Sequence, residues 1–147
     1  MTEINRGQIE NLVRKIIVKA LTPDFQKDSS GIIKVSLPQM EVEEKNRLDT
    51  GNPEDRVYCK DLFTLSESPR LGSGLMYMEE TTFDWHLDYD EIDYVIDGVL
   101  DIIIEKRVNT VKPGELILIP KGSSIQFSVK DKARFVYVTY PADWANQ

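Results

Sequence analysis

The sequence predicts an all-β barrel that follows a short amphipathic helix and a connector. Three observations support this fold class: short β-rich runs fill the region after Asp55, turn residues separate them, and the one helical stripe precedes them. Many short strands without intervening helices favour a barrel or sandwich over an α/β fold. We therefore expect residues 1–21 to form the helix, residues 22–54 the connector and residues 55–147 the barrel.

Residues 5–21 carry apolar side chains on one stripe of an α-helix. The stripe consists of Ile9, Leu12, Val13, Ile16, Ile17 and Ala20. Asn5 and Gln8 fit a capping pair at the start, and Pro23 prevents continuation at the end. Two roles stay open for the stripe: it packs against its own barrel or a second copy, or it docks onto another protein.

The connector is punctuated by turn residues, from Pro23 and Ser29-Ser30-Gly31 to Gly51-Asn52-Pro53. Within it only residues 32–37 are predicted to form a strand, and a short one. The barrel strands are predicted over residues 74–78, 91–96, 99–105, 115–119, 124–129 and 134–140. Asp97-Gly98 lies between two apolar runs, which is a strong signal for a two-residue hairpin. Pro113-Gly114 and Lys121-Gly122 mark further turns.

Charge and composition argue against several classes of function. The 147 residues have a formal net charge of −7, whereas a nucleic-acid surface needs clustered Lys and Arg. Cys59 is the only cysteine, so no internal disulfide can form. No apolar run approaches the roughly 18 residues of a membrane helix, and no secretory signal is visible. We therefore expect a cytoplasmic protein with neither nucleic acid nor a membrane as its partner.

Two segments resemble the paired sequence motifs of cupins, which are jelly-roll β-barrels that commonly hold a metal ion. The first cupin motif has His-x-His, a short spacer, Glu, six residues and Gly; the matching residues are Asp84-Trp85-His86, Glu91 and Gly98. The second has Gly, five residues, Pro-x-Gly, two residues and His; the matching residues are Gly114, Pro120-Lys121-Gly122 and Ile125. The glycine and proline framework is complete, so we expect a cupin-type barrel.

The expected ligand set therefore becomes Asp84, His86, Glu91 and Ile125, a degenerate metal site. Residues two apart in a strand face the same side, so we expect Asp84 and His86 to point into the barrel, with Trp85 and Leu87 facing away. Ile125 supplies no ligand, and we expect no tightly bound metal or cofactor. A weak Mg²⁺ site through Asp84 and Glu91 stays open, because substrate phosphates can complete the shell of that ion.

The catalytic candidates are Asp84, His86, Glu91 and Asp93, all expected in the barrel interior. His86, the only histidine, is either a hydrogen-bonded structural residue or a proton carrier or anion contact. Glu91 and Asp93 share a face by strand parity, and their repulsion would need a cation or a proton. The chain has no Gly-x-x-x-x-Gly-Lys-Ser/Thr loop, and we interpret Lys121-Gly122-Ser123-Ser124 as a turn.

Longer strings are more specific than the cupin pattern. They cover residues 49–53, 65–72, 89–98, 119–127 and 137–144, beginning with Asp49-Thr50-Gly51-Asn52-Pro53. With them, the chain closely resembles the ethanolamine-utilisation Q family over roughly residues 48–144. The resemblance implies a cytosolic protein encoded with a bacterial microcompartment that degrades ethanolamine. It also implies acetate kinase activity, with Mg-ATP as a substrate.

Two functions from different classes follow. The first is a phosphotransferase that exchanges phosphate between ATP and acetate. The second is a non-catalytic scaffold, assembly factor or small-ligand binder of the microcompartment. Cupins often pair through a sheet edge, so we expect a homodimer. Residues 5–21 would then be a segment that docks onto shell or cargo proteins.

Overall fold

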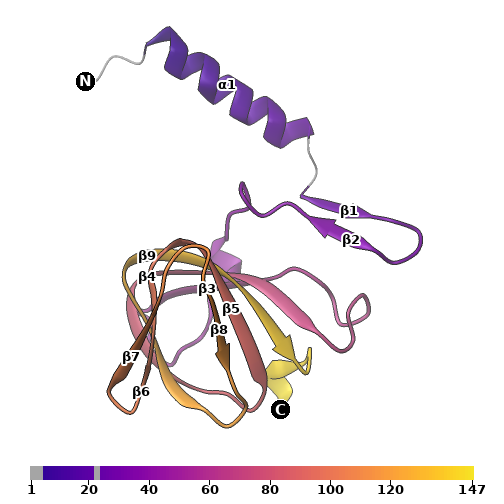
Figure 1. Ribbon diagram of the computed structural model, residues 1–147. Helices are drawn as coiled ribbons and strands as arrows, with labels where there is room; N and C mark the ends of the chain where they lie inside the picture. The colour runs from indigo at the N-terminus through magenta and orange to yellow at the C-terminus, as the bar shows by residue number, and fades with distance from the viewer. Residues whose placement is uncertain (1–4, 22–23) are drawn as a thin grey trace. The chain divides into compact units, whose positions relative to one another are not determined.

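The computed structural model describes residues 5–21 and 24–147, and of residues 18–21 the backbone alone (Figure 1). Its elements in chain order are α1 (Arg6–Leu21), β1 (Phe25–Lys27), β2 (Ile33–Val35), η1 (Glu44–Asn46), β3 (Arg56–Asp61), β4 (Gly72–His86), β5 (Asp90–Gly98), β6 (Leu100–Ile104), β7 (Arg107–Val111), β8 (Leu116–Ile119), β9 (Ser124–Tyr140) and η2 (Trp144–Asn146). The predicted class, a mostly β chain with a helix ahead of it, is confirmed. The chain divides into two compact units between Glu41 and Val42.

Helix α1 begins where the sequence predicts, because Asn5 caps it. The Gln8 backbone N–H donates to Asn5 Oδ1 at 2.9 Å, and the Asn5 N–H donates to Gln8 Oε1 at 3.0 Å. This reciprocal pair satisfies N–H groups that the first turn leaves without helical partners. Pro23 and the side chain of Ala20, which the sequence analysis also used, lie outside what the structure describes. No described helix is long and apolar enough to cross a membrane.

The predicted strand in the connector has a partner that the sequence did not reveal. Strand β2 pairs antiparallel with β1, with Phe25 opposite Val35 and Lys27 opposite Ile33. The first unit therefore contains a short hairpin where the sequence indicates extended chain. Residues from Val42 onward belong to the second unit, where Arg47 forms a β-bridge to Tyr58 of β3.

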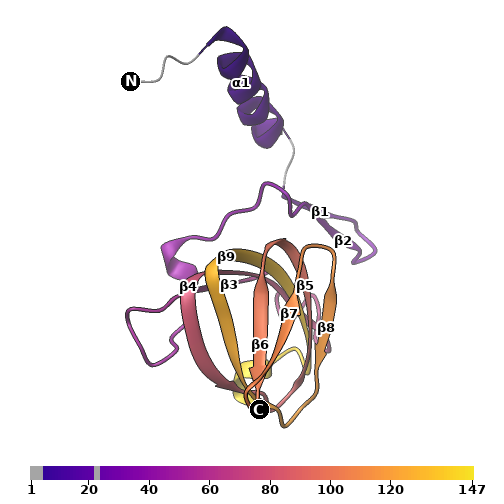
Figure 2. The same cartoon turned by 60° about the vertical axis from the view of Figure 1, so that its left-hand side comes forward.

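The second unit is a barrel built around two long strands. Strands β3, β4, β9, β5 and β8 are hydrogen-bonded in that order, and β6 pairs with both β9 and β7. Figure 2 shows these strands curving around a common interior. The core inside them is mainly apolar, with Val57, Met78, Leu87, Val95, Leu100 and Phe135 fully buried.

Strand β4 contains a bulge that changes which residues face the core. Before it, Met76 and Met78 are buried; after it, Phe83 and Leu87 are. The register with β9 shifts between Glu79 and Thr81, and Glu80 lies at the shift with a φ of 43°. Because a bulge inserts one extra residue, the inward positions change from even to odd numbers.

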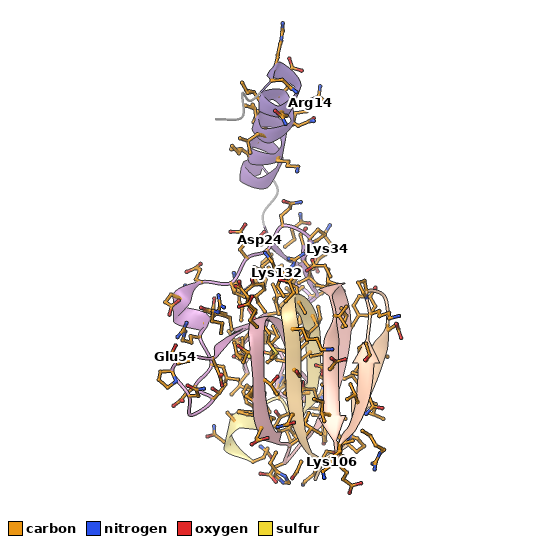
Figure 3. All side chains as sticks on the ribbon, turned by 90° about the vertical axis from the view of Figure 1, so that its left-hand side faces the viewer. Arg14, Asp24, Lys34, Glu54, Lys106 and Lys132 are labelled. Atoms are coloured by element: carbon orange, nitrogen blue, oxygen red, sulfur yellow. The ribbon has the colours of Figure 1, made fainter. Side chains whose placement is uncertain are left out.

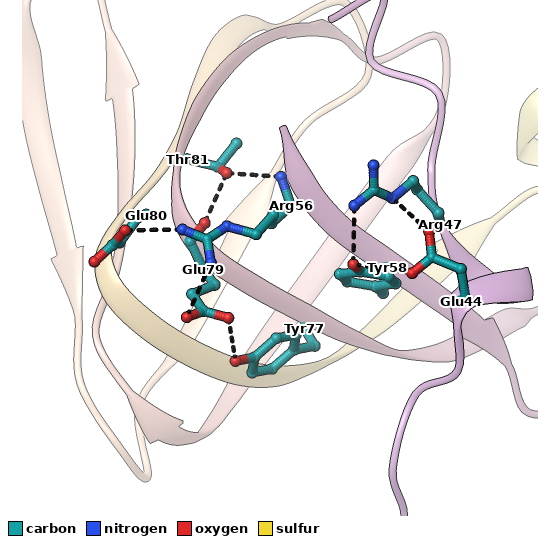
Figure 4. A network of polar contacts seen from close by, with 8 residues as sticks. All are labelled: Glu44, Arg47, Arg56, Tyr58, Tyr77, Glu79, Glu80 and Thr81. Atoms are coloured by element: carbon teal, nitrogen blue, oxygen red, sulfur yellow. Dashed lines mark hydrogen bonds and ion pairs between the residues drawn. The ribbon is translucent and has the colours of Figure 1, made fainter. Parts of the chain in front are cut away.

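Polar contacts hold this bulge against β3 (Figure 4). The Arg56 guanidinium lies 3.3 Å from Glu79 Oε1 and 2.8 Å from Glu80 Oε2. The Arg56 N–H donates to Thr81 Oγ1 at 2.9 Å, and the Thr81 hydroxyl donates to the Glu79 carbonyl at 2.8 Å. Tyr77 donates its hydroxyl to Glu79 Oε2 at 3.0 Å. These contacts fix the place of the extra residue, and with it the orientation of the rest of β4.

Several strand predictions need correction. The predicted strands 124–129 and 134–140 are one strand, β9, while β3 and β7 were not predicted. The hairpin expected at Asp97-Gly98 is wrong, because β5 pairs with β8 and β9 whereas β6 pairs with β7 and β9. Gly98 instead lets β9 approach: a Cβ there would lie 2.0 Å from the Lys132 carbonyl oxygen, and its φ is 80°.

Candidate functional site

The residues predicted as one metal site lie on two sides of the barrel wall. Asp84 and His86 are exposed on the outer face of β4, whereas Glu91 is 5% exposed and faces the interior. The predicted inward orientation of Asp84 and His86 is therefore wrong, because the bulge shifts the parity of β4. Asp84 and Glu91 therefore do not face a common space, as the shared Mg²⁺ site would require. Ile125 faces the interior as predicted, opposite Trp85 in the β4–β9 pairing.

The cupin motif fits when it is moved by one residue. Trp85 and Leu87 then take the paired histidine positions, and the spacer to Glu91 is three residues long. Trp85 packs against the core, and Leu87 is fully buried. Within residues 5–21 and 24–147, no three His, Cys, Asp or Glu side chains gather as a metal site would need.

The interior contains a narrow pocket with an aromatic wall. Six aromatic residues line it: Phe83, Trp85, Tyr89, Phe127, Tyr137 and Trp144. The Trp85 indole N–H donates to the Tyr89 hydroxyl at 2.8 Å. The Trp144 ring lies 6.1 Å from the Trp85 ring and 5.6 Å from the Tyr89 ring, measured between centroids. The short C-terminal η2 thus adds a wall to a pocket otherwise built mainly by strands.

Two buried carboxyl groups set the charge of this interior. Glu91 lines the pocket, and Asp93, two residues further along β5, is 0% exposed, so the predicted shared face is confirmed. Burial raises the pKa of Glu91. Burial, together with the negative charge of Glu91, raises the pKa of Asp93 well above its usual range. The pair therefore holds its protons to a higher pH than an exposed pair would.

Apart from the hydrogen bond that the Asp93 carboxyl shares with Glu91, three buried oxygen atoms of this region have no partner among the described residues. They are the two carboxyl oxygens of Asp93 and the hydroxyl of Thr139, a residue that also lines the pocket. The other titratable groups of the wall remain neutral, because burial raises the pKa of Cys59 and that of Tyr137. The Tyr137 hydroxyl donates to Asp61 Oδ1 at 2.7 Å. The charge inside the barrel is therefore negative or zero.

Asp84 and His86 line a separate cleft on the outer face. With them are Ser124 and Gln126 of β9 and, from the β6–β7 hairpin, Glu105 and Lys106. His86 Nδ1 lies 2.7 Å from Ser124 Oγ, and Nε2 lies 3.2 Å from Asp88 Oδ1. Gln126 Nε2 donates to Asp84 Oδ1 at 3.0 Å. Figure 3 shows Lys106 at one end of the barrel, with Lys132 at the other. This outer cleft contains both signs of charge.

The Lys121-Gly122-Ser123-Ser124 segment begins as a turn, as the sequence predicts. The Lys121 N–H donates to Asp90 Oδ1 at 2.8 Å, and the Gly122 N–H donates to the Leu87 carbonyl at 2.7 Å. The Ser123 hydroxyl donates to the Pro120 carbonyl at 2.7 Å. These groups are used within the fold and are not directed at a phosphate.

Sequence reasoning missed Trp85, Tyr89, Thr139 and Trp144. A signal for Trp85 was present, because Phe83, Trp85 and Leu87 alternate with Asp84, His86 and Asp88. Such alternation places the apolar set in the core. No local signal identifies Trp144, which reaches the pocket only through the tertiary fold.

Comparison with known proteins identifies the family of this chain. The family model described as the ethanolamine utilisation protein EutQ matches residues 4–146. A protein of Clostridioides difficile (strain 630) named "Acetate kinase EutQ" is 62% identical over 154 residues, which cover 100% of this chain and 98% of that protein. An Escherichia coli (strain K12) protein of the same name is 40% identical over 88 residues, covering 60% of this chain and 38% of its own length. The chain thus matches well under half of that relative.

Solved structures support both the family and the fold. The structure of the C. difficile EutQ protein matches with a TM-score of 0.82 and 69% identity, over 86% of this chain and 93% of that chain. A cupin superfamily protein from Desulfitobacterium hafniense matches with a TM-score of 0.52 and 14% identity over 60% of this chain and 81% of that chain, which shows the fold alone. The cupin-type barrel predicted from the sequence is confirmed, and the chain belongs to the EutQ family of ethanolamine utilisation proteins.

Proposed function

We propose that this chain is an acetate kinase that exchanges phosphate between ATP and acetate during ethanolamine utilisation. The observation that carries the proposal is the 62% identity, along essentially the whole of both chains, with a protein named acetate kinase. In the reaction an acetate oxygen attacks the γ-phosphorus of ATP. The bond from that phosphorus to the bridging oxygen breaks, and ADP leaves with the electron pair.

Of the two sites, the outer cleft suits this chemistry better. Phosphoryl transfer is catalysed mainly by positioning and by charges that stabilise the phosphate oxygens. Lys106 supplies a positive charge, and Asp84 and Glu105 supply carboxylates of the kind that hold the Mg²⁺ accompanying ATP. The interior pocket offers Glu91 and no basic side chain among its described lining residues, so it supplies no positive charge for acetate or triphosphate.

The hairpin that carries Lys106 supports this choice. Glu105 and Lys106 form the turn between β6 and β7 with φ values of 49° and 65°. Tight hairpins with two positive φ values favour Asn-Gly, because a side chain in the left-handed region costs about 1–2 kcal/mol. Strained residues beside a cleft are typical of functional positions.

The test is a coupled assay of ADP formation by the purified protein with ATP, acetate and Mg²⁺. Lys106→Gly removes the ammonium group while relaxing the turn, so it should lower turnover at least about tenfold with an unchanged or higher melting temperature. Lys132→Ala, at the opposite end of the barrel, is the matched control. A wild-type protein without activity overturns the kinase proposal; an active Lys106→Gly protein overturns the cleft as its site.

A second function is favoured by the interior pocket: a non-catalytic binder or assembly factor. For this role we place the chain in the cytoplasm at a bacterial microcompartment, with α1 as the docking segment. The described members of its stripe, Ile9, Leu12, Val13, Ile16 and Ile17, are exposed. Deletion of residues 1–21 should abolish encapsulation without changing the melting temperature; a large loss of stability would instead indicate packing within the protein.

We also propose a homodimer formed through the β5–β8 side of the barrel. Strand β8 pairs only with β5 among the described strands. Its outer face is apolar: Leu116 and Leu118 are 64% and 63% exposed, and they lie opposite Tyr94 and Ile92, which are exposed as well. An unpaired edge beside such a patch is the kind of surface that cupins cover by association.

A further inference from the structure

The interior pocket combines a buried acidic side chain, aromatic walls and a hydroxyl without a described partner in one small space. We propose that it binds the ammonium head of a small aliphatic amine. The proposal concerns a site separate from the outer cleft, so it does not depend on whether the chain transfers phosphate.

The electrostatics of the pocket favour a cation. Glu91 and Asp93 are 5% and 0% exposed, and none of the described side chains that line the pocket is a Lys, Arg or His. Buried carboxylates without a counter-charge are costly, so a protein keeps them protonated or pairs them. A ligand that brings one positive charge into this space removes that cost. An anion such as acetate increases it.

The pocket also has unused hydrogen-bonding capacity. The Thr139 hydroxyl is 2% exposed, lines the pocket and has no hydrogen-bond partner among the described residues. Buried polar atoms are normally satisfied, so orphaned atoms beside a cavity indicate a missing partner. A primary ammonium group has three N–H donors and no acceptor. The Glu91 carboxylate and the Thr139 hydroxyl are acceptors for such donors.

The aromatic wall also favours a cation. The centroid of the Trp144 ring lies 6.1 Å from that of Trp85 and 5.6 Å from that of Tyr89. The negative faces of aromatic rings attract cations, Trp most strongly, by about 0.5–2 kcal/mol. Rings combined with a carboxylate are typical of sites for organic cations, because the ring also accepts the carbon atoms next to the nitrogen.

Size and access select the ligand further. The free space admits about one water-sized group, which suits an ammonium head and excludes a bulky quaternary one. Trp144 also lines a wider surface cleft that contains Leu62 and Leu71. Trp144 thus belongs to the walls of both spaces, and we place the short carbon tail of the amine beside its ring.

Proton linkage gives the proposal a second signature. Burial raises the pKa values of Glu91 and Asp93, so the empty pocket loses its protons only at a higher pH than exposed carboxyl groups would. An ammonium ion replaces one of these protons rather than adding to them. Binding should therefore release protons and become tighter as the pH rises through the raised pKa values.

The experiment uses the full chain and its two tryptophans, Trp85 and Trp144, which both line the pocket. Tryptophan fluorescence is followed during titration with ethylammonium, ethanolamine, tetramethylammonium and acetate at constant ionic strength. Saturable changes are expected with the two primary amines and with neither tetramethylammonium nor acetate. Calorimetry in two buffers of different ionisation enthalpy should show proton release.

Glu91→Gln, which keeps the shape of the side chain, should weaken amine binding at least about tenfold. Asp84→Asn, on the outer face, is the matched control and should leave it unchanged. If circular dichroism shows that Glu91→Gln is unfolded, Thr139→Val serves in its place, and we expect a smaller loss of amine affinity. The proposal is overturned if neither amine saturates, if both variants bind the amine equally, or if tetramethylammonium or acetate gives the same response.

Discussion

Asp84 and Glu91 lie on opposite faces of the barrel wall, although the motif spacing suggests that they belong to one site. The bulge at Glu80 turns Asp84 outward with His86, while Glu91 stays inside with Asp93. A single degenerate metal site is thus replaced by two spaces of different chemistry, an outer cleft of mixed charge and an acidic, aromatic interior.

The buried carboxyl of Asp93 makes stability depend on pH. The pKa of Asp93 is raised in the folded state, so the protonated carboxyl favours folding at low pH. This stabilisation is lost as the pH rises from the unfolded pKa of about 3.9 through the higher folded pKa. The Asp93→Asn variant has no carboxyl to ionise at this position, so it does not lose stability in this way. Its free energy of unfolding, measured by urea denaturation, should exceed that of the wild type increasingly above pH 4, by up to about 1.4 kcal/mol per pH unit.

Wild type and Asp93→Asn should converge toward pH 3, where the carboxyl is protonated in both states. A difference that is constant between pH 4 and pH 8 would show that Asp93 ionises normally in the folded protein.

Gly98 and Gly114 share a positive φ but differ in their surroundings. A Cβ at Gly98 would lie 2.0 Å from the Lys132 carbonyl oxygen, whereas one at Gly114 would meet nothing within 4 Å. Gly114→Ala should cost about 1 kcal/mol for its φ alone. Gly98→Ala should cost at least about 3 kcal/mol, because β9 must also move away. Equal losses in thermal denaturation would contradict the close approach of β9.

The apolar side of β8 gives a test of the proposed dimer. Leu116→Lys with Leu118→Lys places two charges on the exposed face and should convert the dimer to a monomer in light scattering after size exclusion. Val108→Lys, at a residue of β7 that is 57% exposed, is the matched control. The double variant should keep its far-ultraviolet circular dichroism, since neither leucine is in the core. A wild-type monomer would contradict the proposal outright.

The moved motif predicts where a metal site could be rebuilt. Trp85→His, Leu87→His and Ile125→His, together with Glu91, would restore the cupin ligand types at inward positions. We expect the triple variant to bind about one Zn²⁺ and to gain thermal stability when Zn²⁺ is added. The double variant without the Leu87 change covers the case in which the triple fails to fold. A folded variant that does not take up Zn²⁺ would show that these side chains do not converge.

Local patterns account for what the sequence predicted well. The start of α1 follows from the Asn5–Gln8 capping pair. The shared face of Glu91 and Asp93 follows from alternation within one short strand. The inward position of Ile125 follows from the alternation of apolar residues along the start of β9.

The errors come from events that connect distant residues. Counting by twos from Met76 and Met78 places Asp84 and His86 inside, and the bulge, held by Arg56 from another strand, reverses this. Asp97-Gly98 has the composition of a hairpin, but its pairing partners are Arg134 and Ala133 of β9. Trp144 reaches the pocket through long-range packing, which no local pattern encodes.

The central claim is that the barrel encloses a carboxyl pair that retains a proton until a cation replaces it. The most direct measurement is a ¹³C NMR titration of the Asp93 side-chain carboxyl, with and without ethylammonium. The account predicts a midpoint well above the usual value of about 3.9 in the free protein and a lower one with the amine bound. A midpoint near the usual value that the amine leaves unchanged would contradict it.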